Sequence, residues 1–358
     1  MCNIINPMSN VVIKFGGSVL SNLDNIGIVA KKIATEFKKP PIIVVSAMSG
    51  VTNKIESVID SVYNSRDLQK DFVFSTGEMF SAGIFSMFLE KFGRKSEPLC
   101  GWQVPIETNS SHGNADIKAV HKERISSLLE RDIIPVVAGF QGICDGRITT
   151  LGRGGTDLSA VSLAVEFGFE CCLYKDVSGI FEVDPSIIKS KKLDFISYES
   201  MHNASLRGSN VVSHKAVKYA SEKNIKVIVK SIFDESECTV ISKKEGDSKN
   251  LIALQKAFCI KLTGLDIPEI ENSIISFNKK WCIFLSESDY LKNKNNFMIE
   301  KMYKVNLMHE KPINIGIFIR IAKKYSEMYG NMDTYSWICV SKDKRKELTR
   351  ELYECFAV

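Results

Sequence analysis

The cysteines of this 358-residue sequence lack any spacing that builds a metal site or a disulfide scaffold. All ten are scattered, with no C-x-x-C pair and no His/Cys ligand spacing. Such a distribution argues against a zinc site and against a disulfide framework. It indicates a reducing compartment, where thiols stay reduced.

Long apolar runs and a leader-like N-terminus are also missing. No basic segment followed by an apolar stretch opens the chain, and no apolar run approaches the roughly 18 residues of a membrane span. We therefore expect a soluble, cytoplasmic protein without a membrane partner.

Charge of a single sign is scarce as well. The 47 basic and 42 acidic residues leave a net charge of +5. This small surplus favours solubility and argues against a nucleic-acid partner. The expected partners are small molecules.

What the sequence does contain is an alternation of strands and helices. Its length suggests two domains, at roughly 150 residues per domain. In the first part, short apolar runs alternate with helical patterns, which is typical of an α/β sandwich with a mainly parallel sheet. Strands are expected at 11–15, 42–45, 133–137, 171–174 and 225–229, and helices after 18 and 53 and at 75–93, 116–129, 158–167, 198–201 and 214–223.

The segment Thr149–Asp157, with the sequence TTLGRGGTD, is the strongest candidate for a binding site. Its glycines let backbone N–H groups approach a ligand, Arg153 offers a planar fork for a carboxylate or phosphate, and the following helix adds its positive dipole end. The pattern fits neither the P-loop nor the dinucleotide motif. It indicates an anion site of another nucleotide fold, and the alternative is a glycine-rich surface turn.

A second candidate is KFGGS at 14–18, where a strand ends in a glycine turn. Lys14 stands at the end of the strand, where its ammonium can lie against phosphates held by the amides of Gly16 and Gly17. The alternative is a lysine that extends from an edge strand into solvent. Successive strand, loop and helix units place such loops at the carboxyl edge of a parallel sheet, where ligands bind.

Three further polar side chains are candidates for the same edge. Ser46 and Thr52 follow the strand at 42–45 and offer hydroxyls, although a helix N-cap explains either equally well. Glu78 lies among apolar residues, where a carboxylate is costly unless it pairs with a cation, so it is suited to a substrate ammonium. Its alternative role is that of a first-turn glutamate facing the helix dipole.

Six motifs, in this order, resemble those of aspartate kinase, a member of the amino-acid kinase superfamily. Glycine loops of this type also occur in acetylglutamate, glutamate and uridylate kinases, whereas the VTN and GE segments resemble the aspartate-specific branch. The motifs are KFGGS at 14–18, VVSAMSGVTN at 44–53, STGEMFSA at 75–82, GFQG at 139–142, TTLGRGGTD at 149–157 and KDVSGIFEVDP at 175–185.

The resemblance implies a three-layer αβα amino-acid kinase fold with a mainly parallel sheet at 8–242, a linker at 243–250, and an ACT-like α+β domain at 251–358. In the last region, strands are expected at 256–262, 281–285 and 335–340, and helices at 315–329 and 342–356. An ACT-like region implies a role in regulation or in forming a homodimer.

The resemblance also implies phosphoryl transfer from ATP to the side-chain carboxylate of L-aspartate, giving 4-phospho-L-aspartate. Lys14 would bridge the phosphoryl group and the attacking carboxylate, and Asp157 would orient Lys14. ATP is expected as a substrate with Mg²⁺, held mostly by phosphates and water, without a tightly bound cofactor. The other implied contacts are phosphate donors at Gly16, Gly17, Gly154 and Gly155, and aspartate contacts at Arg153, Glu78, Thr52 and Ser46.

The sequence departs from the family where the nucleotide should bind. Family members show Thr-Asp before Val-x-Gly, Tyr after it, Arg after Asp-Pro, and a Gly-Ala-Lys-Val-Leu-His-Pro segment. This chain has Ser186 after Asp-Pro, where the family has Arg, and Asn210 in the segment that carries the family Lys. Two cations are therefore missing, and Lys175 and Lys215 are the candidates to replace them. The expected nucleotide-binding residues are thus Lys175, Asp176, Phe181, Ser186, Asn210 and Val211.

The sequence therefore predicts an aspartate kinase of lysine, diaminopimelate, methionine and threonine synthesis. Two alternatives stay open. One is a kinase of another acidic amino acid. The other is a catalytically weakened, ligand-binding regulator, which Ser186 and Asn210 motivate.

Overall fold

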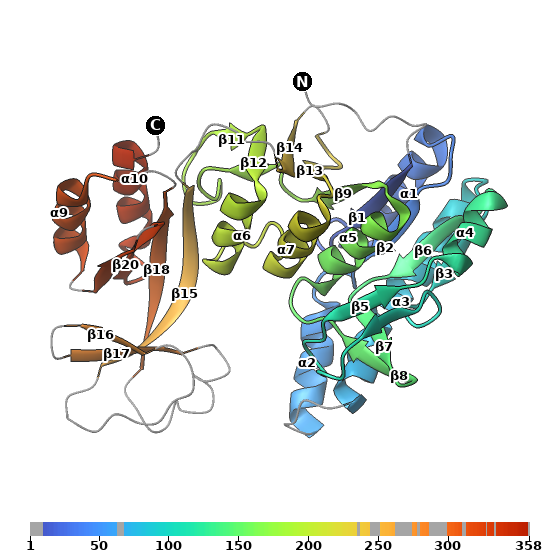
Figure 1. The fold of residues 1–358 in the computed structure, drawn as a ribbon, viewed down its shortest axis with the longest axis horizontal. Helices are drawn as coiled ribbons and strands as arrows, with labels where there is room; N and C mark the ends of the chain where they lie inside the picture. The colour runs from blue at the N-terminus through green and yellow to red at the C-terminus, as the bar shows by residue number, and fades with distance from the viewer. Residues whose placement is uncertain are drawn as a thin grey trace. The chain divides into compact units, whose positions relative to one another are not determined.

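The computed structural model describes residues 10–62, 68–234, 237–243, 251–261, 274–277, 280–285, 299–309, 313–326, 328–332 and 334–356. The chain divides into two compact units (Figure 1). Most of the predicted linker lies outside the described residues. Unit 1 spans Met1–Ile180, Leu193–His202 and Val211–Gly246, and unit 2 spans Phe181–Lys192, Asn203–Asn210 and Asp247–Val358. A single cut in the sequence therefore does not separate the two units.

Unit 1 is built on an eight-stranded sheet. Every neighbouring pair is parallel except β13 with β14, as the buried apolar runs of the sequence predict. In spatial order the strands are β12 (Phe195–Ser197), β14 (Cys238–Ser242), β13 (Val227–Ser231), β9 (Glu170–Lys175), β1 (Val11–Phe15), β2 (Ile42–Val45), β6 (Ile134–Ala138) and β3 (Ser96–Leu99).

Helices cover both faces of this sheet. Ile13 and Phe15 of β1 share a core with α1 and α3, whereas Lys14 between them reaches α5, because successive strand residues face opposite sides. The arrangement is the predicted three-layer αβα sandwich. The helices are α1 (Leu23–Glu36), α2 (Val51–Val62), α3 (Leu68–Lys91), α4 (Glu123–Glu130), α5 (Gly155–Phe167), α6 (Tyr198–Leu206) and α7 (His214–Lys223).

A second sheet of unit 1 has the order β5-β4-β7-β8. Its hairpin turns at Asp145 and Gly146, whose positive φ angles of 49° and 72° suit a tight turn between strands. The predicted helix at 116–129 is wrong in its first half, because Ile117–Val120 pairs with β4 as a strand and the helix begins only at Glu123. The strands are β4 (Ile106–Thr108), β5 (Ile117–Val120), β7 (Gln141–Cys144) and β8 (Arg147–Thr150).

Helix α3 is long and apolar enough to cross a membrane by length and composition, although the sequence predicted no segment of that kind. It packs against α1, α2, β3, β6 and β8. Its buried face carries the polar side chains of Asp71, Ser75 and Glu78 beside Phe85 and Leu89. The helix is therefore part of the core of unit 1.

Unit 2 contains an antiparallel sheet whose described strands number six, and its described C-terminal part includes the helices α9 (Ile315–Tyr325) and α10 (Arg345–Phe356). Its order is β16 (Ile274–Phe277), β17 (Lys280–Leu285), β15 (Leu251–Lys261), β18 (Ile299–Met308), β20 (Tyr335–Val340) and β19 (Tyr329–Asn331). The predicted helix at 315–329 ends early, because the chain is extended at Ser326 and enters β19.

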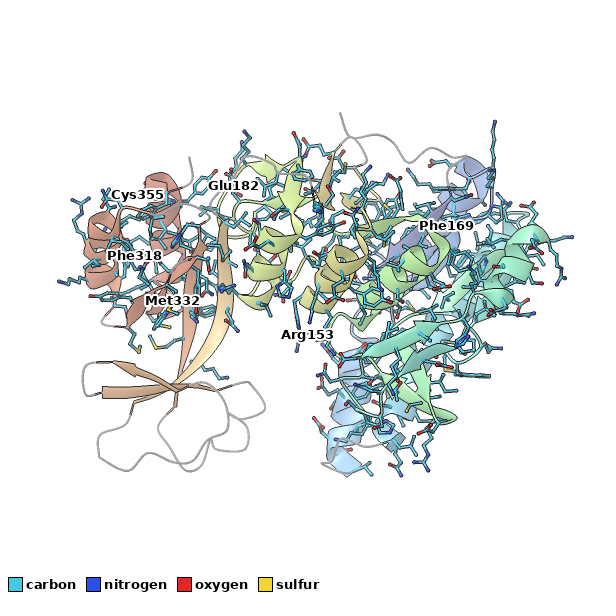
Figure 2. All side chains as sticks on the ribbon, viewed as in Figure 1. Arg153, Phe169, Glu182, Phe318, Met332 and Cys355 are labelled. Atoms are coloured by element: carbon cyan, nitrogen blue, oxygen red, sulfur yellow. The ribbon has the colours of Figure 1, made fainter. Side chains whose placement is uncertain are left out.

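The core of unit 2 also includes residues from within the kinase-like part of the sequence. Val183 and Ile188 pack with Ile252 and Phe318, and Ile252 donates its backbone N–H to the carbonyl of Glu182 (2.8 Å). In the sequence, Val183 and Ile188 lie between the short strands β10 (Ile180–Phe181) and β11 (Lys192–Leu193). Figure 2 labels Glu182 and Phe318 among the side chains of this unit.

Candidate active site

The candidate site lies at the carboxyl edge of the large sheet in unit 1, where β1, β2 and β9 run side by side. Lys14 is the penultimate residue of β1. The backbone N–H of Gly16 donates to the carbonyl of Tyr174 (3.3 Å), and that of Ser46 donates to the carbonyl of Phe15 (3.2 Å). These hydrogen bonds hold the start of each loop against the sheet edge, as the sequence predicts for a parallel sheet.

One buried carboxylate is shared there by two lysines. Lys14 Nζ lies 2.8 Å from Asp157 Oδ1, and Lys175 Nζ lies 2.9 Å from Oδ1 and 3.0 Å from Oδ2. The backbone N–H of Ser213 donates to Oδ2 at 3.3 Å. Two ammonium groups face one carboxylate, so the cluster has a net positive charge that suits an anionic ligand.

The charges of this cluster perturb one another. Burial raises the pKa of Asp157, but the charges and hydrogen bonds of Lys14 and Lys175 outweigh burial and lower it to about 2. Burial lowers the pKa of Lys175 to about 8, and nearby Lys14 adds to this effect while Asp157 opposes it. Lys14 itself is only 5% exposed in an interior strand, so its alternative role on an edge strand is wrong.

The glycines of the site are required by close contacts. Gly154 has a φ of 73° directly before α5, and a Cβ there would lie 2.4 Å from the Cβ of Ser213. A Cβ on Gly17 would lie 2.7 Å from the carbonyl oxygen of Ala47. Gly155 is buried as the first residue of α5. The loop is thus packed against its neighbours, which the alternative of a surface turn does not explain.

Two residues of the quoted motifs, Phe140 and Thr156, were not singled out from the sequence. Phe140 has a φ of 70°, which is strained for a bulky residue, and a Cβ on Gly155 would lie 3.0 Å from its ring. Thr156 is buried, and a Cβ on Gly139 would lie 2.4 Å from its methyl group. Such strain collects at functional sites. The GFQG motif was the only sequence signal for this turn.

Glu78 lies in the interior of α3, because the helix begins at Leu68. Its alternative role as a first-turn residue is therefore wrong. The side chain is buried, and Oε1 accepts the backbone N–H of Ala47 at 3.1 Å. Burial raises the pKa of Glu78 to about 7, opposed by that hydrogen bond and by the charge of Lys14. Glu78 and Lys14 thus belong to one electrostatic site.

The remaining predicted aspartate contacts lie in loops and at a helix start. Ser46 is half-buried and Thr52 is exposed. Neither directly precedes α2, which begins at Val51, so the N-cap alternative does not hold for that helix. Arg153, labelled in Figure 2, is exposed and lies between Gly152 and Gly154 in the sequence, and within the described chain it makes no hydrogen bond or ion pair. Its guanidinium is thus available to a ligand.

The predicted nucleotide-binding residues fall in both units. Asp176 is exposed at the end of β9, and Val211 lies half-buried before α7 in unit 1. Phe181, Ser186 and Asn210 belong to unit 2.

The two candidate replacement cations have different environments. Lys215 is bound elsewhere: its Nζ donates to Asp116 Oδ1 (2.9 Å) and to the carbonyls of Asn114 (3.2 Å) and Ala115 (3.4 Å). Lys175, in contrast, lies beside Lys14. The geometry favours Lys175 over Lys215 as the second cation of the site.

Comparison with known proteins identifies the family of this chain. Residues 10–231 match the amino acid kinase family model. The chain is 34% identical over 275 residues to an aspartokinase of Geobacillus stearothermophilus, covering 75% of this chain and 68% of the relative. It is 34% identical over 277 residues to the aspartokinase of Bacillus sp. (strain MGA3), covering 76% and 67%.

A solved structure shares the fold over most of the chain. It is E. coli aspartokinase III in complex with aspartate and ADP, with a TM-score of 0.76 at 18% identity, covering 96% of this chain and 99% of the other. At this identity the likeness speaks for the fold, including the smaller α+β region.

Proposed function

The chain belongs to the amino acid kinase family as an aspartokinase, and from this premise we propose the part that each residue of the site plays. The reaction is transfer of the γ-phosphoryl group of ATP to the side-chain carboxylate of L-aspartate. The observation that carries the proposal is the buried cluster of Lys14, Asp157 and Lys175 at the sheet edge.

The chemistry asks for positioning and charge neutralisation rather than a general base. A carboxylate acceptor is already ionised at pH 7. The bond that forms joins a carboxylate oxygen to the γ-phosphorus, and the bond that breaks joins that phosphorus to the bridging oxygen of ADP. Fixed cations are needed where charge spreads over the transferred oxygens.

Lys14 contacts the transferred phosphoryl group, and Asp157 orients Lys14. The 2.8 Å contact between the two supports this assignment. The low pKa of Asp157 keeps its carboxylate ionised throughout the working range, so it accepts hydrogen bonds from the lysines and does not take a proton. Asp157 is thus a positioning residue, and Lys14 is the catalytic one.

Lys175 supplies a second cation to the phosphates. Its Nζ shares the Asp157 carboxylate with Lys14, which places both ammonium groups at one point of the sheet edge. An ammonium is a flexible point charge that can reach phosphate from different anchor positions. In this role Lys175 replaces cations that the family carries near Ser186 and Asn210.

Glu78 binds the ammonium of aspartate, and Arg153 binds one of its carboxylates. The burial of Glu78 supports this role, because a buried carboxylate gains from a cationic partner. The exposed guanidinium of Arg153 offers two parallel donors to a carboxylate. Ser46 and Thr52 position the substrate from the neighbouring loop.

The nucleotide is held by the backbone around Gly16, Gly17, Gly154 and Gly155. Asp176 and Val211 complete its surroundings in unit 1. Phe181, Ser186 and Asn210 stay predictions from the resemblance. Mg²⁺ would arrive with ATP, held mostly by the phosphates and water, and would neutralise charge on the phosphates.

At the level of the cell, the protein works in the cytoplasm in lysine, diaminopimelate, threonine and methionine synthesis. We infer a homodimer through unit 2 from the resemblance of that region to an ACT-like domain. Light scattering of the purified chain tests the dimer.

A substrate panel tests the proposed reaction. ADP release from ATP and Mg²⁺ is measured with aspartate, glutamate and N-acetylglutamate, and hydroxylamine traps the acyl phosphate as a hydroxamate. Aspartate alone is expected to give efficient turnover. Preference for another acid would assign the chain to a different substrate of the same superfamily.

A further inference from the structure

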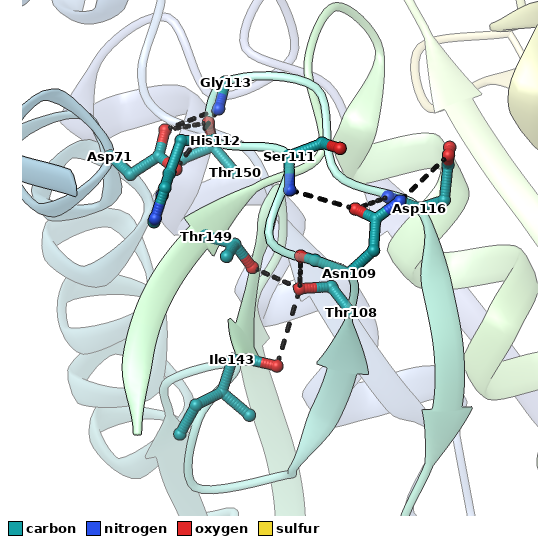
Figure 3. Close-up of polar contacts among 10 residues, drawn as sticks. All are labelled: Asp71, Thr108, Asn109, Ser111, His112, Gly113, Asp116, Ile143, Thr149 and Thr150. Carbon is teal, nitrogen blue, oxygen red and sulfur yellow. Dashed lines mark hydrogen bonds and ion pairs between the residues drawn. The ribbon is translucent and has the colours of Figure 1, made fainter. Parts of the chain in front are cut away.

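A buried carboxylate outside the proposed chemistry connects three parts of unit 1. Asp71 in the first turns of α3 is 1% exposed. It accepts a hydrogen bond from the hydroxyl of Thr150 (2.5 Å), from Nδ1 of His112 (2.7 Å) and from the backbone N–H of Gly113 (3.0 Å). Figure 3 shows these donors converging on the carboxylate.

These donors lie on both sides of the loop that carries Arg153. Thr150 precedes the loop in the sequence, and the segment with His112 and Gly113 packs against it. Thr150 is the last residue of β8 and lies three positions before Arg153. Gly113 and Asn114 contact Gly152, where a Cβ would lie 2.8 Å from Asn114 Oδ1 and 3.2 Å from the carbonyl oxygen of Gly113. Asp71 therefore fixes the loop that carries Arg153 from both sides.

The same helix carries the proposed ammonium site. Asp71, Ser75 and Glu78 follow one another at spacings of four and three residues, so they share the buried face of α3. The carbonyl of Ser75 accepts a hydrogen bond from Nε2 of Gln141 at 3.2 Å, which connects the helix to β7. One rigid helix thus bears Glu78 directly and anchors the Arg153 loop through Asp71.

We propose that Asp71 is a positioning residue that sets the distance between Glu78 and Arg153, and thereby the preference for aspartate over a longer acidic amino acid. This inference rests on the proposed roles of Glu78 and Arg153. Aspartate and glutamate differ by one methylene between the ammonium and the side-chain carboxylate. When Glu78 and Arg153 hold the amino acid in a fixed position, its side-chain carboxylate meets the phosphoryl group at Lys14 at one chain length only, so the site discriminates by that length.

The test removes one hydrogen bond at a time. Thr150→Val keeps the side-chain volume but loses the donor to Asp71, whereas the matched control Thr150→Ser keeps the donor. Asp71→Asn serves as a second variant. The measured quantity is the ratio of kcat/KM for aspartate to kcat/KM for glutamate, with KM for ATP and the unfolding temperature measured beside it.

Thr150→Val and Asp71→Asn are expected to lower that ratio about tenfold, since one methylene is typically discriminated by about 10- to 200-fold. KM for ATP should stay within about twofold and Thr150→Ser should match the wild type, because only the acceptor end is loosened. A merely structural role would lower stability and leave the ratio unchanged.

Two results would be read differently. A wild type that phosphorylates aspartate, with an unchanged ratio in both variants, overturns the role of Asp71 and leaves the proposed function intact. A wild type without turnover on aspartate overturns the proposed function itself, whatever the variants do.

Discussion

At the scale of single residues, the site contains one acid and one base whose titration falls near physiological pH. Burial raises the pKa of Glu78 to about 7 and lowers that of Lys175 to about 8. Between these values Glu78 is ionised and Lys175 is protonated. The free site therefore has its full set of charges only in a narrow pH window, as in other active sites with perturbed groups.

The first prediction concerns Glu78 and the amino acid. An acid with a raised pKa is charged above that pKa, so kcat/KM for aspartate should rise with pH up to about 7 and then level off. Glu78→Gln should raise KM for aspartate about 10- to 100-fold, which is the weight of a hydrogen bond to a charged group. Initial rates between pH 5.5 and 8.5 measure both effects.

Thermal unfolding of the Glu78→Gln variant shows whether a loss of activity comes from misfolding. A buried acid with a raised pKa destabilises the folded state as pH rises from its unfolded pKa to about 7, because the folded form binds the extra proton. The variant should therefore unfold at the same or a higher temperature than the wild type at pH 8. An aspartate profile that keeps its rise near pH 7 in Glu78→Gln would refute the assignment.

The second prediction concerns Lys175 and the nucleotide. A base with a lowered pKa is charged below that pKa, so kcat/KM for ATP should fall as pH rises through about 8. The other charged groups that face this ammonium are Asp157 on α5 and Lys14 on β1. Lys175→Met should lower kcat/KM for ATP about 100-fold, the typical weight of one stabilising donor.

Lys175→Arg separates charge from shape in the same experiment. Arginine stays protonated throughout this range. If the loss above pH 8 reflects the charge of Lys175, the arginine variant keeps its activity to higher pH than the wild type. A profile identical in both proteins would show that another group titrates.

At the scale of elements, helix α5 joins the glycine loop to the charge cluster. Gly154 precedes its first residue and Gly168 follows its last, and both glycines adopt the left-handed conformation. The environment of the two glycines differs: Gly154 is packed against Ser213, whereas a Cβ at Gly168 would meet nothing within 4 Å. The two glycines that flank the helix are therefore a matched pair: both test the cost of a left-handed backbone, but only Gly154 also tests packing at the site.

The third prediction uses this pair. Gly168→Ala should cost about 1–2 kcal/mol of unfolding free energy, the penalty for a left-handed alanine, and leave kcat unchanged. Gly154→Ala should cost about 1–3 kcal/mol more from the contact with Ser213 and should impair turnover, because Asp157 follows in the first turn. Thermal unfolding and ADP release measure the two effects. Equal losses of unfolding free energy and of turnover in both variants would contradict a packed glycine loop.

Much of the element pattern was predictable from sequence for physical reasons. The parallel strands are continuous apolar runs, and Asp145-Gly146 is a strong hairpin signal. The strand Ile117–Val120 was missed because its pairing with β4, not its own periodicity, decides its conformation. Local patterns thus specified the layers but not every pairing.

The site was predictable residue by residue but not as an arrangement. Lys14, Glu78 and Asp157 stood out from motif and context, and the structure brings all three together. The bond from Lys175 to Asp157 depends on β9 lying beside β1, which no local pattern gives. Asp71 and the strained Phe140 were missed because burial and φ angles have no counterpart in sequence spacing.

At the scale of the whole molecule, the two units interleave along the chain. Residues 181–192 follow the DVSG segment, yet Val183 and Ile188 are buried in the core of unit 2. In that unit the hydroxyl of Tyr353 on α10 donates to the buried Glu182 at 2.9 Å. The segment that continues from the predicted nucleotide loop is thus built into the C-terminal unit.

The fourth prediction follows from this interleaving. A chain ended after Lys243 would expose Val183 and Ile188, at a cost of about 3–6 kcal/mol for two buried aliphatic side chains. That is a large share of the roughly 5–15 kcal/mol that stabilises a domain. The shortened chain should be poorly soluble or unfold well below the full chain in thermal unfolding. A shortened chain with unchanged stability and turnover would show that the units are independent.

The most direct test of the central claim is aspartate-dependent phosphoryl transfer by the wild type and by Lys14→Ala, with hydroxylamine trapping of the product and calorimetric binding of aspartate to both. We predict that the wild type forms the hydroxamate and that Lys14→Ala forms none while still binding aspartate. Turnover by Lys14→Ala at the wild-type rate would contradict the assigned chemistry. A wild type that binds aspartate without turnover would leave a ligand-binding regulator.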